Sequence, residues 1–292
     1  MRVRSLPKAG LLTVAVGLGV TGLVGATGVI AAGAAPGTPP AGYVVVTSSP
    51  VTAVSGRQTP APVVCPGTTK PVSGGAHVDS SSTLVNLNSS YPVGRHSWKV
   101  RVNNLSGVDV TFEVYAVCID RLSPDFTVNT TFVDNQPHHV QSARVGCAQG
   151  VMVGGGVKSD SVKPKVSIHY TGPDGAPGFE TAWVVLMNNP TASPVGFTVY
   201  SICAKHAPDS AHVVLGSKIP NPAGTQATAG AQCGDGSVPL SGGAFSSSTA
   251  STVSMSSSFP QGPGWSASEN NTSTRAATAQ AAVICSGPYP PG

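Results

Sequence analysis

Six cysteines, arranged as three similarly spaced pairs, constrain the fold of this chain more than any other feature of its sequence. The members of a pair are separated by 53, 56 and 52 positions. The pairs are Cys65 and Cys118, Cys147 and Cys203, and Cys233 and Cys285. Such regular spacing indicates an internal repeat, which has to be recognised before any single element is interpreted.

Each pair frames the same landmarks. A Gly-Gly follows the first cysteine by eight or nine positions, and one tryptophan follows the Gly-Gly. An Asn-Asn begins five positions after the tryptophan, and the second cysteine lies 20 positions after it. The landmarks are Gly74-Gly75, Trp98 and Asn103-Asn104; Gly155-Gly156, Trp183 and Asn188-Asn189; and Gly242-Gly243, Trp265 and Asn270-Asn271. The chain therefore contains three copies of a unit of about 75 residues, near the size of a small independent domain.

Alternating apolar and polar residues predict β-strands within each unit. Trp98, Val100 and Val102 alternate with Lys99 and Arg101, a period of two that is typical of a half-buried strand. We expect an all-β protein of three tandem, disulfide-stapled antiparallel units, each like a β-sandwich or jelly roll, with about six strands apiece. The alternative is one pseudo-threefold body that resembles a β-prism.

The repeat boundaries divide the chain into six segments. We expect a signal peptide at 1–34, a Pro/Gly linker at 35–42, β repeats at 43–120, 121–205 and 206–286, and a tail at 287–292.

The N-terminus predicts export. Arg2, Arg4 and Lys8 precede an uncharged apolar run, and small residues at Ala32-Gly33-Ala34 suit a signal peptidase. We expect a secreted, extracellular protein that has no membrane contact after cleavage. The run is longer than an ordinary signal core, so an uncleaved membrane anchor is the competing interpretation.

The charge balance argues against nucleic acid as a partner. Three of the 16 Lys and Arg residues lie in the leader, which leaves 13 against 12 acidic residues. Nucleic-acid binding requires a basic patch or stripe. The densest basic runs, Lys99/Arg101 and Lys158/Lys163/Lys165, are interpreted as ordinary solvated strand edges.

The landmarks resemble a repeated module of exported bacterial proteins of uncharacterised function. The resemblance covers nearly all of the chain after the leader, and it implies a secreted β-module without an established activity or site. Unit two departs from the pattern with Thr171 in the place of a proline, and unit three has Ala279 and Ala282 where unit one has Phe112 and Tyr115. The matching residues of unit one are Cys65-Pro66-Gly67, Gly74-Gly75, Ser90-Tyr91-Pro92, Trp98, Asn103 and Tyr115-Ala116-Val117-Cys118.

The cysteines are expected to form disulfides within repeats. Six cysteines can pair in fifteen ways, and equivalent positions in each unit select Cys65–Cys118, Cys147–Cys203 and Cys233–Cys285. No Cys-x-x-Cys occurs in the sequence and no histidine recurs near the cysteines, so we expect neither a metal site nor a cofactor.

Two groups of aromatic residues receive different predictions. Trp98, Trp183 and Trp265 are assigned to the core, with Trp265 more exposed because it shares its strand face with Ala267 and Glu269. Five residues are candidate binding residues: Tyr115 and Tyr200, which point away from the disulfide face of their strands, and Tyr91, Tyr170 and Phe259 at expected turns. For all five, packing against a neighbouring unit is the structural alternative.

No recognisable catalytic set accompanies these residues. Gly-x-Ser-x-Gly does not occur in the sequence, and the acidic residues fall at unmatched positions in the three units. We therefore expect a non-enzymatic extracellular binding or adhesion module for a cell-surface or environmental polymer such as a glycan. A structural or spacer component of the cell envelope is the alternative, followed by a secreted hydrolase with an unrecognised site.

Overall fold

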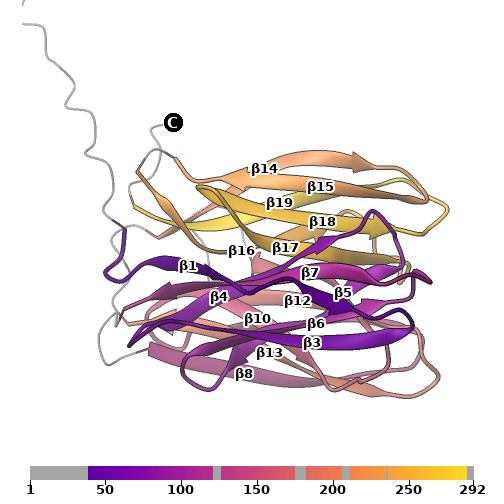
Figure 1. Ribbon diagram of the computed structural model, residues 1–292, viewed down its shortest axis with the longest axis horizontal. Helices are drawn as coiled ribbons and strands as arrows, with labels where there is room; N and C mark the ends of the chain where they lie inside the picture. Colours follow the sequence, from indigo (N-terminus) through magenta and orange to yellow (C-terminus); the bar gives the residue numbers. More distant parts are fainter. Residues whose placement is uncertain (1–38, 121–125, 175–181, 206–210, 235, 288–292) are drawn as a thin grey trace, which may run out of the picture. The chain divides into compact units, whose positions relative to one another are not determined.

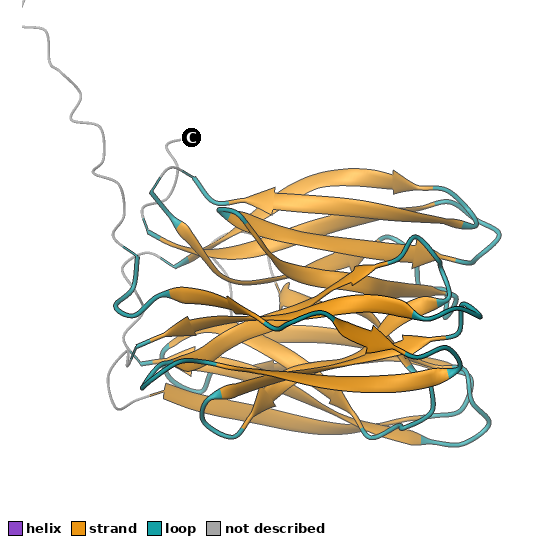
Figure 2. Ribbon diagram, viewed as in Figure 1, coloured by secondary structure: helices purple, strands orange, loops and turns teal. Residues whose placement is uncertain are grey.

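The computed structural model describes residues 39–120, 126–174, 182–205, 211–234 and 236–287. Every regular element in these ranges is a β-strand (Figure 2). Repeat 1 contains β1 (Val44–Thr47), β2 (Val51–Ala53), β3 (Arg57–Val64), β4 (Lys70–Asp79), β5 (Val85–Val93), β6 (Ser97–Asn104) and β7 (Val110–Ile119). Repeat 2 contains β8 (Phe126–Asn135), β9 (His139–Gly146), β10 (Val151–Ser159), β11 (Ser167–Asp174), β12 (Ala182–Asn189) and β13 (Val195–Ala204). Repeat 3 contains β14 (His212–Asn221), β15 (Thr225–Gln232), β16 (Val238–Ser246), β17 (Val253–Gln261), β18 (Gly264–Asn271) and β19 (Ala277–Ser286).

The strands form three antiparallel sheets, and each sheet joins half of one repeat to half of another (Figure 1). Sheet A has the order β1-β7-β4-β17-β18-β15, with β2 also paired to β7. Sheet B has the order β3-β6-β5-β10-β13-β8, and sheet C the order β14-β19-β16-β11-β12-β9. The all-β, three-unit arrangement is thus confirmed. Because every sheet is shared, the pseudo-threefold alternative describes it better than three separate sandwiches do.

The halves of each sheet meet at a seam between two repeats. Ala76 pairs with Ser258 in sheet A, Val157 with Ser90 in sheet B, and Ala244 with Thr171 in sheet C. The three strands β4, β10 and β16 also contact one another, as do β5, β11 and β17. The described residues consequently form a single compact unit with one continuous hydrophobic core.

Neither position of the Gly-Gly landmark has room for a side chain. A Cβ on the first glycine, as at Gly74, would run into the ring of Trp98 of its own repeat. A Cβ on the second glycine would collide with a backbone carbonyl oxygen of a different repeat: Ser258 for Gly75, Ser90 for Gly156 and Thr171 for Gly243. Only glycine allows this close approach of backbones across the seam.

The tryptophans lie in the core and hydrogen-bond to the same seam residues. The indole Nε1 donates to a hydroxyl in each repeat: Trp98 to Ser90 at 2.8 Å, Trp183 to Thr171 at 2.6 Å, and Trp265 to Ser258 at 2.9 Å. A buried indole N–H needs such an acceptor. All three tryptophans are at most 1% exposed, so the expectation of a more exposed Trp265 is wrong. Its neighbour Glu269 is itself in the interior, where Asn221 Nδ2 donates to its carboxylate at 2.9 Å.

The first asparagine of each Asn-Asn connects the repeats in a ring. Nδ2 of Asn103 donates to the carbonyl of Val166 at 2.8 Å, that of Asn188 to Val253 at 2.6 Å, and that of Asn270 to Val85 at 2.7 Å. Repeat 1 is thereby joined to repeat 2, repeat 2 to repeat 3, and repeat 3 to repeat 1. All three asparagines are buried, so these bonds satisfy interior carbonyls that water does not reach.

The disulfides are those expected from the repeat, Cys65–Cys118, Cys147–Cys203 and Cys233–Cys285. Each joins the two half-sheets of one repeat, because β3 and β7, for example, belong to sheets B and A. Three disulfides are consistent with an extracellular location.

Candidate functional site

Four of the five candidate aromatic residues meet in pairs on the outer side of a seam. In sheet B, Tyr200 of β13 lies opposite Gly156, and its ring stacks on Tyr91 of β5 at 6.1 Å between centroids. In sheet A, Tyr115 of β7 lies opposite Gly75, and its ring contacts Phe259 of β17 at 5.3 Å. In both sheets, rings from two different repeats cover a glycine that has no side chain of its own.

The third seam differs. Gly243 lies opposite Ala282 in sheet C, so no aromatic pair can form at the equivalent place. Tyr170 packs edge-on against Phe245 instead, at 5.6 Å. The pairing of Pro173 with Trp183 also shows that Pro173, not Thr171, is the counterpart of the prolines in the other two repeats.

Tyr91, Tyr170 and Phe259 lie within strands, which corrects their expected position at turns. Tyr91 is 6% exposed and Phe259 is 8% exposed, because each is covered by the tyrosine of the neighbouring repeat. Tyr115, Tyr200 and Tyr170 are half-buried and remain accessible. The structure therefore leaves one accessible aromatic ring at each seam, supported by a second ring.

The outer face of sheet B adds positive charge to its aromatic pair. Lys99 of β6 lies opposite Tyr91, and Arg101 lies opposite Ser89. The Arg101 guanidinium is 6.0 Å from the Tyr91 ring centre, and its Nη1 donates to the carbonyl of Ser159 at 2.9 Å. The two basic runs that the sequence separates are thus neighbours in space.

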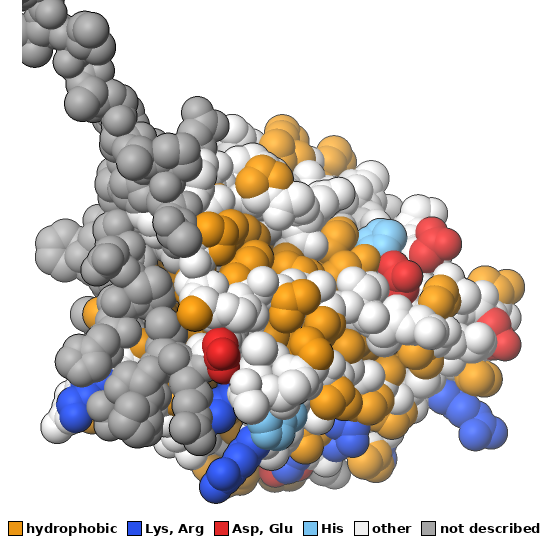
Figure 3. All heavy atoms as spheres, turned by 60° about the vertical axis from the view of Figure 1, so that its left-hand side comes forward, with side chains coloured by type: hydrophobic (Ala, Val, Ile, Leu, Met, Phe, Trp, Pro, Cys, Tyr) orange, Lys and Arg blue, Asp and Glu red, His pale blue; other side chains and the backbone are white. Residues whose placement is uncertain are grey.

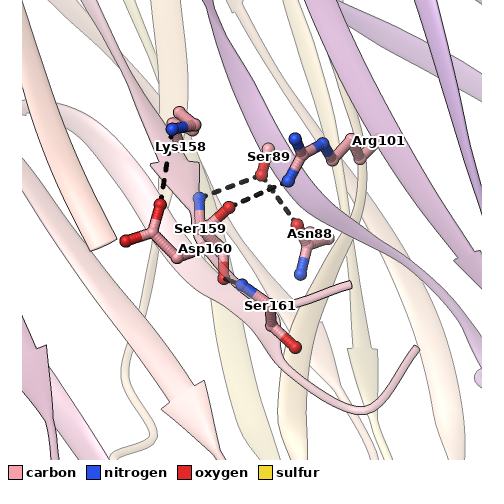
Figure 4. Close-up of polar contacts among 7 residues, drawn as sticks. All are labelled: Asn88, Ser89, Arg101, Lys158, Ser159, Asp160 and Ser161. Carbon is pink, nitrogen blue, oxygen red and sulfur yellow. Dashed lines mark hydrogen bonds and ion pairs between the residues drawn. The ribbon is translucent and has the colours of Figure 1, made fainter. Parts of the chain in front are cut away.

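Figure 4 shows how the seam positions these charges across two repeats. The backbone N–H of Ser159 donates to Ser89 Oγ at 3.0 Å, and Ser89 Oγ donates to Asn88 at 2.7 Å. Lys158 forms a 3.4 Å ion pair with Asp160. Burial raises the pKa of the Tyr200 hydroxyl, and Tyr91 and Asp160 raise it further, so Tyr200 is a neutral donor at physiological pH.

Phe132 is a component of this face that the sequence interpretation missed. It lies opposite Thr198 on the edge strand β8, is 58% exposed, and places its ring over Gly196. A signal for Phe132 was available in the sequence. The residues two positions before and after it, Thr130 and Asp134, are polar and exposed, so Phe132 is an aromatic residue on the polar face of its strand. We call Tyr91, Tyr200, Phe132, Arg101 and Lys158 the sheet B platform.

The corresponding part of sheet A carries the opposite charge. Tyr115 Oη donates to Glu113 Oε2 at 3.1 Å, and His77 contacts the Phe259 ring at 4.8 Å. Burial and the neighbouring Glu113 raise the pKa of Tyr115 to about 12. A groove of about 390 Å³ beside these residues includes Asp79 in its lining. On the face drawn in Figure 3, acidic and histidine side chains lie among hydrophobic ones, while lysine and arginine side chains are scattered.

Among the described residues, no cluster of three or more His, Cys, Asp or Glu side chains could hold a metal ion. In the same part of the chain, no helix is long and apolar enough to cross a membrane. Comparisons with protein-family models and with curated proteins find no match.

Proposed function

We propose that this protein is an exported, non-catalytic binding module that attaches to an extracellular polymer, a glycan, through the sheet B platform. The observation that carries the proposal is that the supported ring of Tyr200 shares the outer face of sheet B with exposed Phe132, Arg101 and Lys158. Export is part of the proposal, because the leader lies outside the described residues.

The chemistry of the platform suits a sugar polymer with acidic groups. An aromatic ring offers an apolar face on which a sugar ring can lie, and a tyrosine hydroxyl adds a hydrogen bond at its edge. The Arg101 guanidinium presents planar N–H donors that match a carboxylate or phosphate. Tyr91 under Tyr200, and Ser159 beside Arg101, hold both groups in place before a ligand arrives, which lowers the entropy cost of binding.

The test is co-sedimentation of oxidised residues 35–292, which contain every described strand and all six cysteines, with insoluble polymers. Peptidoglycan, chitin, cellulose and whole cells are the probes. We expect pelleting with at least one of them, with the strongest pelleting on a polymer that carries acidic groups. Tyr200→Ala and Phe132→Ala should each reduce the bound fraction about tenfold, the loss of 1–2 kcal/mol expected for one aromatic contact.

The chain supplies a matched control for this experiment. Tyr115 occupies the position of Tyr200 on another sheet, so Tyr115→Ala makes the same chemical change away from the platform. It should leave pelleting unchanged. Equal loss in both variants, or no pelleting by the folded wild-type protein, contradicts the proposal.

A structural or spacer role in the cell envelope is the second candidate function. The observation in its favour is that Tyr91 and Phe259 are almost completely buried and fill seams between repeats. In that role the aromatic pairs serve stability alone. Tyr200→Ala would then lower the free energy of unfolding without changing any binding.

A further inference from the structure

We propose that the end of the molecule formed by the turns after β2, β4 and β6 and their counterparts docks on an anionic lipid surface. In Figure 1 this is the right-hand end, opposite the end where the described chain begins and finishes. The inference does not depend on the polymer-binding proposal, because none of its residues belongs to the sheet B platform. It replaces the expectation that the protein makes no membrane contact.

Four aliphatic side chains are exposed together at this end of repeat 1. They are 38% to 64% exposed: Val54, Leu84, Leu105 and Val108. We call these residues the apolar tip. Exposed aliphatic residues are unremarkable when scattered singly, but a cluster of them on loops marks an interaction surface.

The second asparagine of the Asn-Asn landmark assembles the apolar tip. Asn104 Nδ2 donates at 2.8 Å to the carbonyl of Ala53, the last residue of β2, and to that of Val108, in the turn after β6. The N–H of Leu105 donates to the carbonyl of Leu84 at 3.0 Å and attaches the third turn. Several backbone carbonyls of the tip are therefore paired internally, which lowers the cost of bringing its aliphatic surface into contact with hydrocarbon.

The other two repeats build the same turns with different chemistry. Asn189 donates to the carbonyl of Ser193, and Asn271 to that of Arg275, as Asn104 does to Val108. Three positions can be compared across repeats 1, 2 and 3: Leu84, Lys165 and Thr252; Leu105, Pro190 and Thr272; and Val108, Ser193 and Arg275. Packing of the scaffold does not require aliphatic residues at these positions, since repeats 2 and 3 lack them.

Cations lie next to the apolar tip. Arg57 begins β3 directly after the turn of Val54. Gln58 Nε2 donates to the carbonyl of Ser161 at 3.3 Å, and Asn103 Nδ2 donates to that of Val166, so the loop with Lys163 and Lys165 is held against repeat 1. This loop also presents Val162, which is 77% exposed. Arg57, Lys163 and Lys165 are exposed and form no ion pair within the described residues.

Repeat 3 contributes a hydroxyl-lined groove of about 600 Å³ at the same end. Its loops are fixed by side-chain hydrogen bonds such as Thr272 Oγ1 to the carbonyl of Thr252 at 2.8 Å. Arg275 is the one charged residue among those that line it. Aliphatic side chains, unpaired cations and a hydroxyl groove match the acyl chains, phosphates and polyol headgroups of an anionic lipid surface. Four carboxylates at or next to these turns oppose this charge: Asp79, Asp109, Asp134 and Asp160. Asp109 accepts from the N–H of Ser55 at 2.8 Å, and Asp160 forms a 3.4 Å ion pair with Lys158.

The test is flotation of oxidised residues 35–292 with vesicles of phosphatidylcholine alone and of an equal mixture with phosphatidylglycerol. We expect flotation with the anionic vesicles, weakened by high salt, and little with phosphatidylcholine alone. The tip variant combines Leu84→Thr and Leu105→Thr, which introduce the residues of repeat 3, with Val108→Ser, which introduces the residue of repeat 2. Its bound fraction should fall at least about tenfold. Val64→Thr removes an equally exposed aliphatic side chain far from the turns and is the control.

The outcomes separate the two proposals. Lys163→Ser with Lys165→Thr should reduce both the binding and its dependence on salt, since each neutralised contact removes part of the salt effect. Unchanged pelleting of the tip variant with insoluble polymers shows that the platform works independently. No flotation with anionic vesicles at low salt, or undiminished flotation of the tip variant, overturns the inference.

Discussion

Gly75 and Ser258 belong to different repeats, yet the carbonyl oxygen of Ser258 occupies the place where a side chain on Gly75 would begin. The same relationship recurs at Gly156 and at Gly243, each against another repeat. The three units are therefore interlocked through their backbones.

Adding a methyl group at a seam should be costly. We expect Gly75→Ala to lower the free energy of unfolding by at least about 2 kcal/mol, because the new Cβ meets backbone that cannot rotate away. Chemical denaturation followed by tryptophan fluorescence measures the change. Gly230→Ala is the control, since a Cβ there has no neighbour closer than 3.9 Å. Equal stability of the two variants would show that the seam can relax.

Interlocking also predicts how the protein responds to the loss of one disulfide. Replacing Cys233 and Cys285 by alanine should destabilise the whole protein by about 2–5 kcal/mol. Because repeat 3 supplies half of sheet A and half of sheet C, unfolding should stay a single transition that moves to a lower midpoint. Calorimetry would contradict this if one third of the unfolding enthalpy separated into an earlier transition.

The ring of asparagine bonds makes a further prediction. Asn270→Ala leaves the buried carbonyl of Val85 without its 2.7 Å donor, which should cost about 1–3 kcal/mol. Hydrogen exchange should increase most in β5 and β17, the strands that begin beside this bond. Thr272→Ala, at an exposed hydroxyl, is the control, and an equal effect there would argue against a special role for the ring.

Two buried ionisable groups, His169 and Glu269, should make the free energy of unfolding depend on pH in opposite directions. Burial lowers the pKa of His169 below its ordinary 6.5, although Asn188 and Ser248 hydrogen-bond to its ring. The unfolded chain therefore takes up a proton at a pH where the folded His169 stays neutral, and stability falls as the pH drops below 6.5. Unfolding free energies at several pH values should show a smaller loss of stability in acid for His169→Gln than for the wild type.

For Glu269 the sign is reversed. Burial raises the pKa of its carboxyl above 4.5, so the folded state favours the protonated form and loses stability as the pH rises through that range. Glu269→Gln keeps an oxygen acceptor for Asn221 and should be more stable than the wild type at neutral pH. The advantage should shrink in acid, and a constant difference at all pH values would exclude this explanation.

The sequence by itself determined the three repeats, their strand content and the disulfide pairing. Cysteine spacing and the two-residue alternation are local properties of the chain, and joining the two cysteines of each unit gives the pairing that the structure has. Core assignment succeeded for the same reason at Trp98 and Trp183. It failed for the exposure of Trp265, because a glutamate beside it signals solvent unless Asn221 is known to bond to its carboxylate.

Only the tertiary structure decided which half-sheets belong together. Hydrogen bonds between strands such as β4 and β17 link residues nearly two hundred positions apart, and no local pattern states that partnership. The sheet B platform and the apolar tip follow from it, since Arg101 meets Ser159 and Asn103 meets Val166 only when two repeats share a sheet. Periodicity determines which face of a strand is polar, but the neighbouring strand determines which side chains gather there.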